Sequence, residues 1–104
     1  MPIADVTVIP IGTEGPSVSR YVADIQRILA KHQEAGAIRF QLTPMNTIIE
    51  GDLPVIFQVI QEIHNAPYNH GIQRVATSIR IDDRRDKIST MEKKLESVQE
   101  QLKE

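Results

Sequence analysis

The stretch "LTPMNTIIEGD", from Leu42 to Asp52, decides how the chain is organised. The alternating run "AIRFQL" leads into it, and the run "TIIEG" follows its Pro-Met-Asn turn. Two short alternating runs joined by a turn predict an antiparallel hairpin. Because this hairpin lies in the middle of the chain, the fold depends on what flanks it.

Upstream of the hairpin, the sequence predicts one strand and one helix. Residues Ile3 to Ile11 alternate apolar and polar side chains, and Pro10 fits such a strand only at an edge or near its end. The loop "GTEGPSVS" follows, in which Ser17 or Ser19 can cap an amphipathic helix that runs to about Ala35, before a glycine.

Downstream of the hairpin, the same pattern is repeated. Asp52 caps a second amphipathic helix that has Pro54 in its first turn, and "NAPYNHG" ends it. Residues 72–81, "IQRVATSIRI", alternate as a last strand. The order β-α-β-β-α-β predicts an α+β fold, a ferredoxin-like sandwich formed by a single domain of residues 1–104.

Right-handed crossovers place both helices on one face of the sheet and leave the other face open. Alternation assigns to this open face a mixture of polar and apolar side chains, with either Ile48 and Glu50 or their neighbours added. The set is Asp5, Thr7, Ile9, Arg39, Gln41, Arg74, Ala76 and Ser78. Such a face is either an ordinary solvated surface or a subunit interface that holds a small polar ligand.

An additional helix is expected from about Arg84 to Lys103. Its apolar residues recur at alternating spacings of three and four, which is typical of a coiled-coil seam that needs a partner surface. They are Ile88, Met91, Leu95, Val98 and Leu102. We expect this helix to pack on its own sheet edge or on a neighbouring subunit.

The composition excludes several classes of function. The net charge is −2 and there is no cysteine, so neither a basic nucleic-acid surface nor a thiolate site is expected. The three histidines, His32, His64 and His70, lie on different elements without the spacing of a metal site. No secretory signal and no apolar run of about 20 residues is present, so we expect a cytoplasmic protein without membrane contact.

The residues around the hairpin turn allow two interpretations. Asn46 can serve a left-handed turn, Met45 can fill a gap, and Glu50 can face solvent. Alternatively, these side chains line one wall of a pocket, with the Ser17 and Ser19 loop presenting amides to an anion. Taken alone, the residues do not decide between the two.

Three segments together resemble one family, the small YkoF-like thiamine-binding proteins of the UPF0045 type. They are "IPIGTEGPSVSRYVADI", "LTPMNTIIEGD" and "QRVATSIRIDDRRDK". The resemblance implies a ferredoxin-like fold without catalytic activity. It also implies homodimers, paired sheet to sheet, that assemble into homotetramers.

The resemblance further implies a ligand, thiamine or its hydroxymethylpyrimidine moiety, which we expect at or near a subunit interface, and no required cofactor. Ser17 and Ser19 match the family's Ser-x-Ser, and Thr47 and Glu50 match its Pro-Met-Gly-Thr…Glu-Gly stretch, where Asn46 replaces the glycine. In this interpretation Glu50 accepts a hydrogen bond from the exocyclic amine. The serine hydroxyls contact ring nitrogens, and Met45 covers a ring face.

Three other functions fit the topology. One is a regulatory or assembly module that binds another metabolite. An acylphosphatase is disfavoured because Arg20 and Asn46 are its only candidate residues and the surrounding loop does not match. RNA binding is rejected because Phe40, the only strand aromatic, is predicted to point inward.

Overall fold

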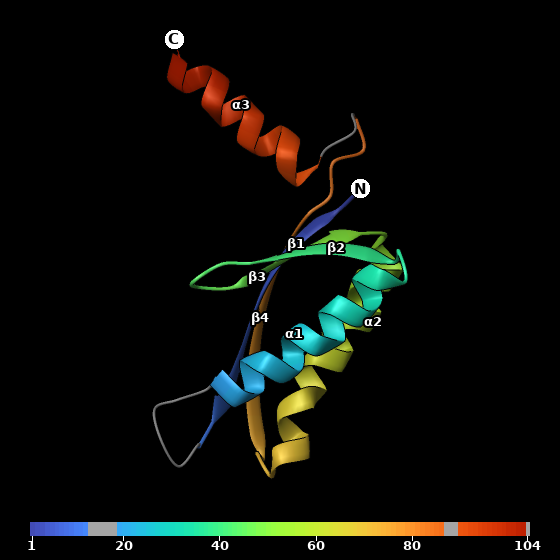
Figure 1. Cartoon of the computed structure of the whole chain (residues 1–104), viewed down its shortest axis with the longest axis vertical. Helices are drawn as coiled ribbons and strands as arrows, with labels where there is room; N and C mark the ends of the chain where they lie inside the picture. Colours follow the sequence, from blue (N-terminus) through green and yellow to red (C-terminus); the bar gives the residue numbers. More distant parts are fainter. Residues whose placement is uncertain (13–18, 87–89, 104) are drawn as a thin grey trace.

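The computed structural model describes residues 1–12, 19–86 and 90–103 (Figure 1). Its elements follow the predicted order, with a short 3-10 helix η1 after the second helix and an extra helix at the end. They are β1 (Ile3–Ile11), α1 (Ser19–Glu34), β2 (Ile38–Leu42), β3 (Thr47–Gly51), α2 (Leu53–Asn65), η1 (Ala66–His70), β4 (Arg74–Asp82) and α3 (Met91–Lys103).

The four strands form one antiparallel sheet in the order β2-β3-β1-β4. Helices α1 and α2 lie side by side on one face of the sheet (Figure 1). This arrangement confirms the predicted ferredoxin-like fold. Strand β1 is nine residues long and pairs with β4 along its whole length, but it pairs with β3 only from Ile3 to Val6.

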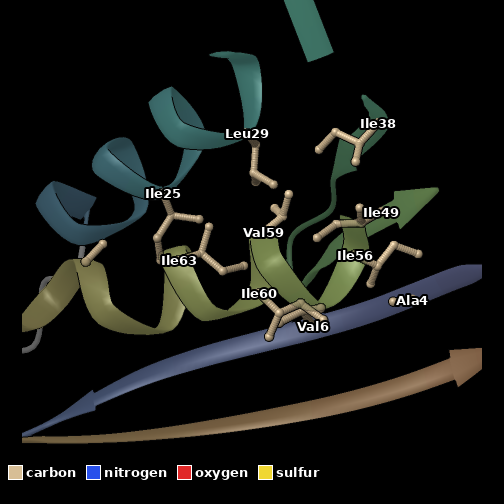
Figure 2. Close-up of a cluster of buried hydrophobic side chains, with 11 residues drawn as sticks. Ala4, Val6, Ile25, Leu29, Ile38, Ile49, Ile56, Val59, Ile60 and Ile63 are labelled. Carbon is tan, nitrogen blue, oxygen red and sulfur yellow. The ribbon is translucent and has the colours of Figure 1, made fainter. Parts of the chain in front are cut away.

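The core lies between the two helices and the inner face of the sheet. Figure 2 shows Leu29 of α1 and Val59 of α2 pointing toward each other above the sheet, and both side chains are fully buried. Ala4 and Val6 of β1 and Ile49 of β3 close the cluster from below. Each large aliphatic side chain buried in this way stabilises the fold by roughly 1.5–3 kcal/mol relative to its exposed state.

The helix ends agree with the predicted stop signal and depart from the predicted cap. Gly36 adopts a left-handed φ of 76°, and the Ala37 N–H donates to the His32 carbonyl at 3.0 Å, which ends α1. Asp52 occupies the position before α2 with an extended backbone, but its side chain makes no capping hydrogen bond. Its main-chain carbonyl instead accepts from the Ile56 N–H at 2.9 Å.

The last helix begins later than predicted. We expected helix from about Arg84, whereas α3 begins at Met91. Arg84 and Arg85 each pair with an aspartate two residues away, a spacing that does not bring side chains together on a helix. The Thr90 hydroxyl accepts from the Lys93 N–H at 3.1 Å and so caps α3.

Helix α3 extends away from the rest of the domain (Figure 1). None of its residues is buried, and the side chains of its apolar stripe that follow Met91 are exposed; they are Leu95, Val98 and Leu102. The predicted stripe residue Ile88 lies outside the described residues. Within the described parts of the chain, α3 therefore does not use its apolar face to pack on its own sheet.

Candidate functional site

A cleft of about 440 Å³ opens where β1 continues beyond the end of β3. One wall is β1 from Val6 to Ile9, the second is α1 with Val22, Ile25 and Gln26, and the third is the hairpin from Leu42 to Thr47. Ile63 of α2 lies at its base. No charged or aromatic side chain is among these described lining residues.

The hairpin wall is held by one hydroxyl. Thr43 Oγ1 donates to Asn46 Oδ1 at 2.5 Å and accepts from the main-chain N–H groups of Asn46 and Met45 at 3.1 and 3.3 Å. The Thr43 N–H donates to the Asn46 carbonyl at 2.9 Å. Asn46 is not left-handed, because no described residue other than glycine has a positive φ. Its side chain therefore shapes the turn through Thr43.

Three of the predicted site residues line this cleft together. Met45 stands at the hairpin tip with 82% of its surface exposed, Asn46 is half-buried, and Thr47 is buried at 7% exposure. Ser17 lies outside the described residues. Ser19 is the first residue of α1, one helical turn before Val22 in the cleft wall.

Glu50 lies on the opposite face of the sheet. Thr47 pairs with Val6, whose side chain points to the helices, whereas Glu50 pairs with Ile3 three positions along. Because side chains alternate along a strand, Glu50 points to the open face. No single cleft of this chain therefore joins Glu50 to Met45, Asn46 and Thr47.

The Glu50 carboxyl group is buried, and one of its oxygens has an ion pair but no hydrogen bond among the described residues. Its side chain is 5% exposed, and Oε2 lies 3.7 Å from Arg39 Nη1. Among the described residues, nothing forms a hydrogen bond with that oxygen. A buried carboxylate oxygen in this state is costly unless something else approaches it.

Arg39 also joins the open face to α3. Its guanidinium donates to Glu92, with one contact of 3.0 Å, and this hydrogen bond lowers the pKa of Glu92 and raises that of Arg39. Lys94 pairs with Asp82 of β4 and lowers the pKa of that carboxyl group. Asp5 and Arg80 pair across the same face at 2.8 Å. The start of α3 is thus held to the sheet by charged pairs.

The structure adds a residue that the sequence analysis did not select. Gln26 lines the cleft from α1, and its Nε2 atom is buried without a hydrogen-bond partner in the described structure. The signal was present, because position 26 stands four residues after Val22 and three before Leu29, within the apolar stripe. A polar side chain on a buried stripe is a candidate for ligand contact or for a buried hydrogen bond.

The rim of the cleft is apolar and unusually exposed. Ile9, Leu42 and Met45 are each at least half exposed, and Val22 is more than one-third exposed. They come from three different elements and surround one opening. A group of large apolar side chains around a concave opening is typical of a surface that something covers.

Each histidine joins two structural elements. His32 of α1 pairs with Glu62 of α2, and His70 of η1 pairs with Asp24 of α1. The His70 contact lowers the pKa of Asp24. His64 of α2 lies 2.6 Å from the Thr77 hydroxyl of β4. These contacts give all three side chains a role in packing.

The described ranges offer no side-chain group for a metal site and no helix for a membrane span. No group of three or more metal-ligating side chains is found there. None of the helices in those ranges is both long and apolar enough to cross a membrane.

Comparison with known proteins places the chain in a family. A family model described as thiamine-binding protein matches residues 4–99. The UPF0045 protein YqgV of Bacillus subtilis is 65% identical over 102 residues, which are 98% of each chain. The UPF0045 protein MJ1052 of Methanocaldococcus jannaschii is 36% identical over 98 residues, covering 94% of this chain and 92% of that protein.

Solved structures agree with this assignment. The crystal structure of MJ1052 superposes with a TM-score of 0.83 over 95% of this chain and 96% of that one. A Thermotoga maritima protein proposed to act in thiamine biosynthesis or salvage has the same fold, with a TM-score of 0.72 at 19% identity, covering 93% of this chain and 97% of that one. The chain therefore belongs to the UPF0045 family, whose family model is that of thiamine-binding proteins.

Proposed function

We propose that this protein binds thiamine or its hydroxymethylpyrimidine moiety without transforming it, and that the cleft beside Thr47 is the site. The cleft volume of about 440 Å³ falls within the range of roughly 300–1,000 Å³ that is usual for small-molecule sites. Its walls are mainly apolar and carry a few polar groups. This combination suits a flat heterocycle with hydrogen-bonding atoms on its edge.

The observation that carries the proposal is Gln26, a residue that lines an apolar cleft and whose buried Nε2 has no hydrogen-bond partner in the described structure. An unsatisfied buried amide costs the free protein stability, and a ligand acceptor would remove that cost. Thr47 supplies a hydroxyl from the opposite wall, and Met45 supplies a flexible thioether that can cover a ring face. The predicted contacts of Met45, Asn46 and Thr47 are thus retained in the proposal.

The neutral lining implies an orientation for the ligand. Because no charged side chain lines the cleft in the described structure, the uncharged pyrimidine fits inside better than the cationic thiazolium. We place the thiazolium at the mouth, toward the start of α1. The free hydroxymethylpyrimidine should then bind with an affinity within about tenfold of that of thiamine.

Calorimetry with thiamine and with the free pyrimidine tests the site. Thr47→Val keeps the shape of the side chain and removes its hydroxyl. The affinity of this variant for both ligands should therefore fall severalfold. Glu50→Gln is the matched variant on the other face of the same strand, and it should leave the affinity unchanged. Unchanged binding in Thr47→Val with a loss in Glu50→Gln would move the site to the open face.

We propose a second role for the open face and α3, namely pairing with further copies of the chain as a homodimer that assembles into a homotetramer. Among the described residues, Glu50 Oε2 accepts no hydrogen bond beside its Arg39 ion pair, and Leu95 and Val98 are exposed; a second copy can supply partners for both. Sedimentation velocity checks this, and a monomer at micromolar concentration would refute it.

A regulatory module that binds another metabolite is the alternative, since an apolar cleft with a few polar groups does not by itself select thiamine. A thermal-shift screen separates the two proposals, because a ligand that binds only the folded state raises the melting temperature. A larger shift with an unrelated metabolite than with thiamine would favour the alternative.

A further inference from the structure

Strand β1 has main-chain groups that no strand pairs. The Gly51 N–H donates to the Pro2 carbonyl at 3.3 Å, and the β1–β3 pairs then run from Ile3↔Glu50 to Val6↔Thr47. In an antiparallel sheet, the main-chain groups of successive residues point alternately to the two neighbouring strands. Even-numbered residues of β1 therefore face β3, and odd-numbered residues face β4.

The two neighbours of β1 differ in length, so in the described structure the main-chain groups of one residue on the β3 side have no strand partner. Pairing with β4 continues to Ile11, so the odd-numbered residues are satisfied throughout. Pairing with β3 ends at Val6, so the N–H and C=O of Val8 point to a side where no strand follows. The next residue whose main-chain groups point to this side is Pro10, which has no N–H.

The cleft runs along this free edge. Its lining includes Val6 and Val8, whose side chains point to the helices, and also Thr7 and Ile9, whose side chains point to the open face. A cavity touches both faces of a strand in this way when it meets the edge of the strand between them. The main chain of Val8 is therefore part of the cleft wall.

We propose that the Val8 main chain is the element that recognises the aminopyrimidine ring. A 4-aminopyrimidine carries an accepting ring nitrogen next to a donating amine. The N–H and C=O of one extended residue form the complementary pair, so Val8 would donate to the ring nitrogen and accept from the amine. This inference rests on the proposed function and specifies how the same cleft distinguishes its ligand.

The length of the edge favours a small heterocycle over an added strand. Strand addition needs a row of alternating donors and acceptors. Here the row is one residue long, because β3 occupies Ala4 and Val6, and Pro10 lacks a donor. A single donor and acceptor pair matches one ring edge.

Amide hydrogen exchange in the unmodified protein tests the inference directly. Adding the free hydroxymethylpyrimidine should slow exchange of the Val8 amide by about tenfold or more. The amides of Thr7 and Ile9, which face β4, should change little. Protection that spreads equally over all three amides, or that omits Val8, would overturn the inference.

A pair of variants gives a second test by calorimetry. Val8→Pro replaces the N–H that faces the cleft by a ring carbon, shortens the side chain and leaves the β4 ladder intact, as Pro10 already does in the same strand. Val8→Ala is the control, because it shortens the side chain and keeps the N–H. Val8→Pro should bind the pyrimidine about twofold to tenfold more weakly than Val8→Ala, the loss expected for one hydrogen bond.

The outcomes separate this inference from the proposed function. Equal affinities in Val8→Pro and Val8→Ala, with Thr47→Val still weakened, would overturn the role of Val8 and keep the site. Absence of binding of both thiamine and the free pyrimidine by the unmodified protein would overturn both proposals. If Val8→Pro does not fold, the exchange experiment on the unmodified protein decides.

Discussion

Replacing Gln26 by leucine should make the protein more stable and a poorer binder. The Nε2 atom of Gln26 is buried without a hydrogen-bond partner in the described structure. An unsatisfied buried group of this kind costs about 1–3 kcal/mol. Leucine is similar in size and in helix propensity, and position 26 continues the apolar stripe between Val22 and Leu29.

The expected gain is near the lower end of that range, because the Gln26 side chain as a whole is half-buried. We expect the free energy of unfolding of Gln26→Leu to rise by about 1 kcal/mol. For a domain of this length, that corresponds to an increase in melting temperature of about 4–8 °C. Gln58→Leu is the matched control on the exposed face of α2, and it should change stability by less than about 0.5 kcal/mol.

Urea and thermal denaturation of both variants, with and without thiamine, measure the two effects together. At a fixed concentration, a ligand that binds the folded state raises the melting temperature more when its affinity is higher, so the thiamine-dependent shift should be smaller in Gln26→Leu than in Gln58→Leu. A loss of stability in Gln26→Leu would mean that the amide has a partner in solution. The argument that Gln26 is kept at a cost in stability because its amide contacts a ligand would then be refuted.

Three further predictions address the frame of the site. Gly51→Ala should lower the free energy of unfolding by about 1–3 kcal/mol in urea titration, because a Cβ there would lie 3.2 Å from the Ala37 carbonyl oxygen in a buried position. Because Arg39 lowers the pKa of Glu92, the stability from this pair is present above the unfolded-state pKa and is lost as pH falls through the folded-state pKa. Amide exchange in α3 should accelerate over that acidic range, and Glu92→Gln should weaken this pH dependence and leave the part that the Asp82–Lys94 pair contributes. Leu95→Lys should leave the melting temperature of the protomer unchanged and shift sedimentation toward smaller species, whereas an unchanged distribution would exclude α3 from assembly.

Much of the fold could be predicted because local signals and periodicity agree. The Pro-Met-Asn turn gives the hairpin, Gly36 gives the end of α1, and alternation gives the inner and outer faces of β1. The start of α3 could not be predicted from its apolar spacing. That spacing begins only at Ile88, after the arginines and aspartates that pair locally, and it does not reveal that Thr90 supplies the cap.

Thr47 and Glu50 are three residues apart in one strand and so face opposite sides in any register, but which of them faces the helices depends on a register that the sequence leaves open. Both residues stand in the short run "TIIEG", so they are near each other in sequence. Which of them faces the helices depends on whether Thr47 or its neighbour pairs opposite Val6, and a shift of one residue exchanges the faces. The sequence therefore allows two alternatives for β3, and the structure places Glu50 on the open face.

The cleft arises from a difference in strand length, which no motif encodes. Strand β1 has nine residues and β3 has five, so one edge of β1 runs on without a partner. Pro10 is the residue in the sequence that indicates this unpaired edge. A proline in an otherwise central strand is tolerated only where its missing N–H has no strand to pair with. Together with Gln26 on the helix that faces the same gap, Pro10 indicates an unpaired edge beside an unpaired amide. A polar residue on an apolar stripe and a proline in a central strand each oppose stability locally. Gln26 lines the cleft and Pro10 directly follows the β1 residues that line it, so both departures lie at the site proposed for binding.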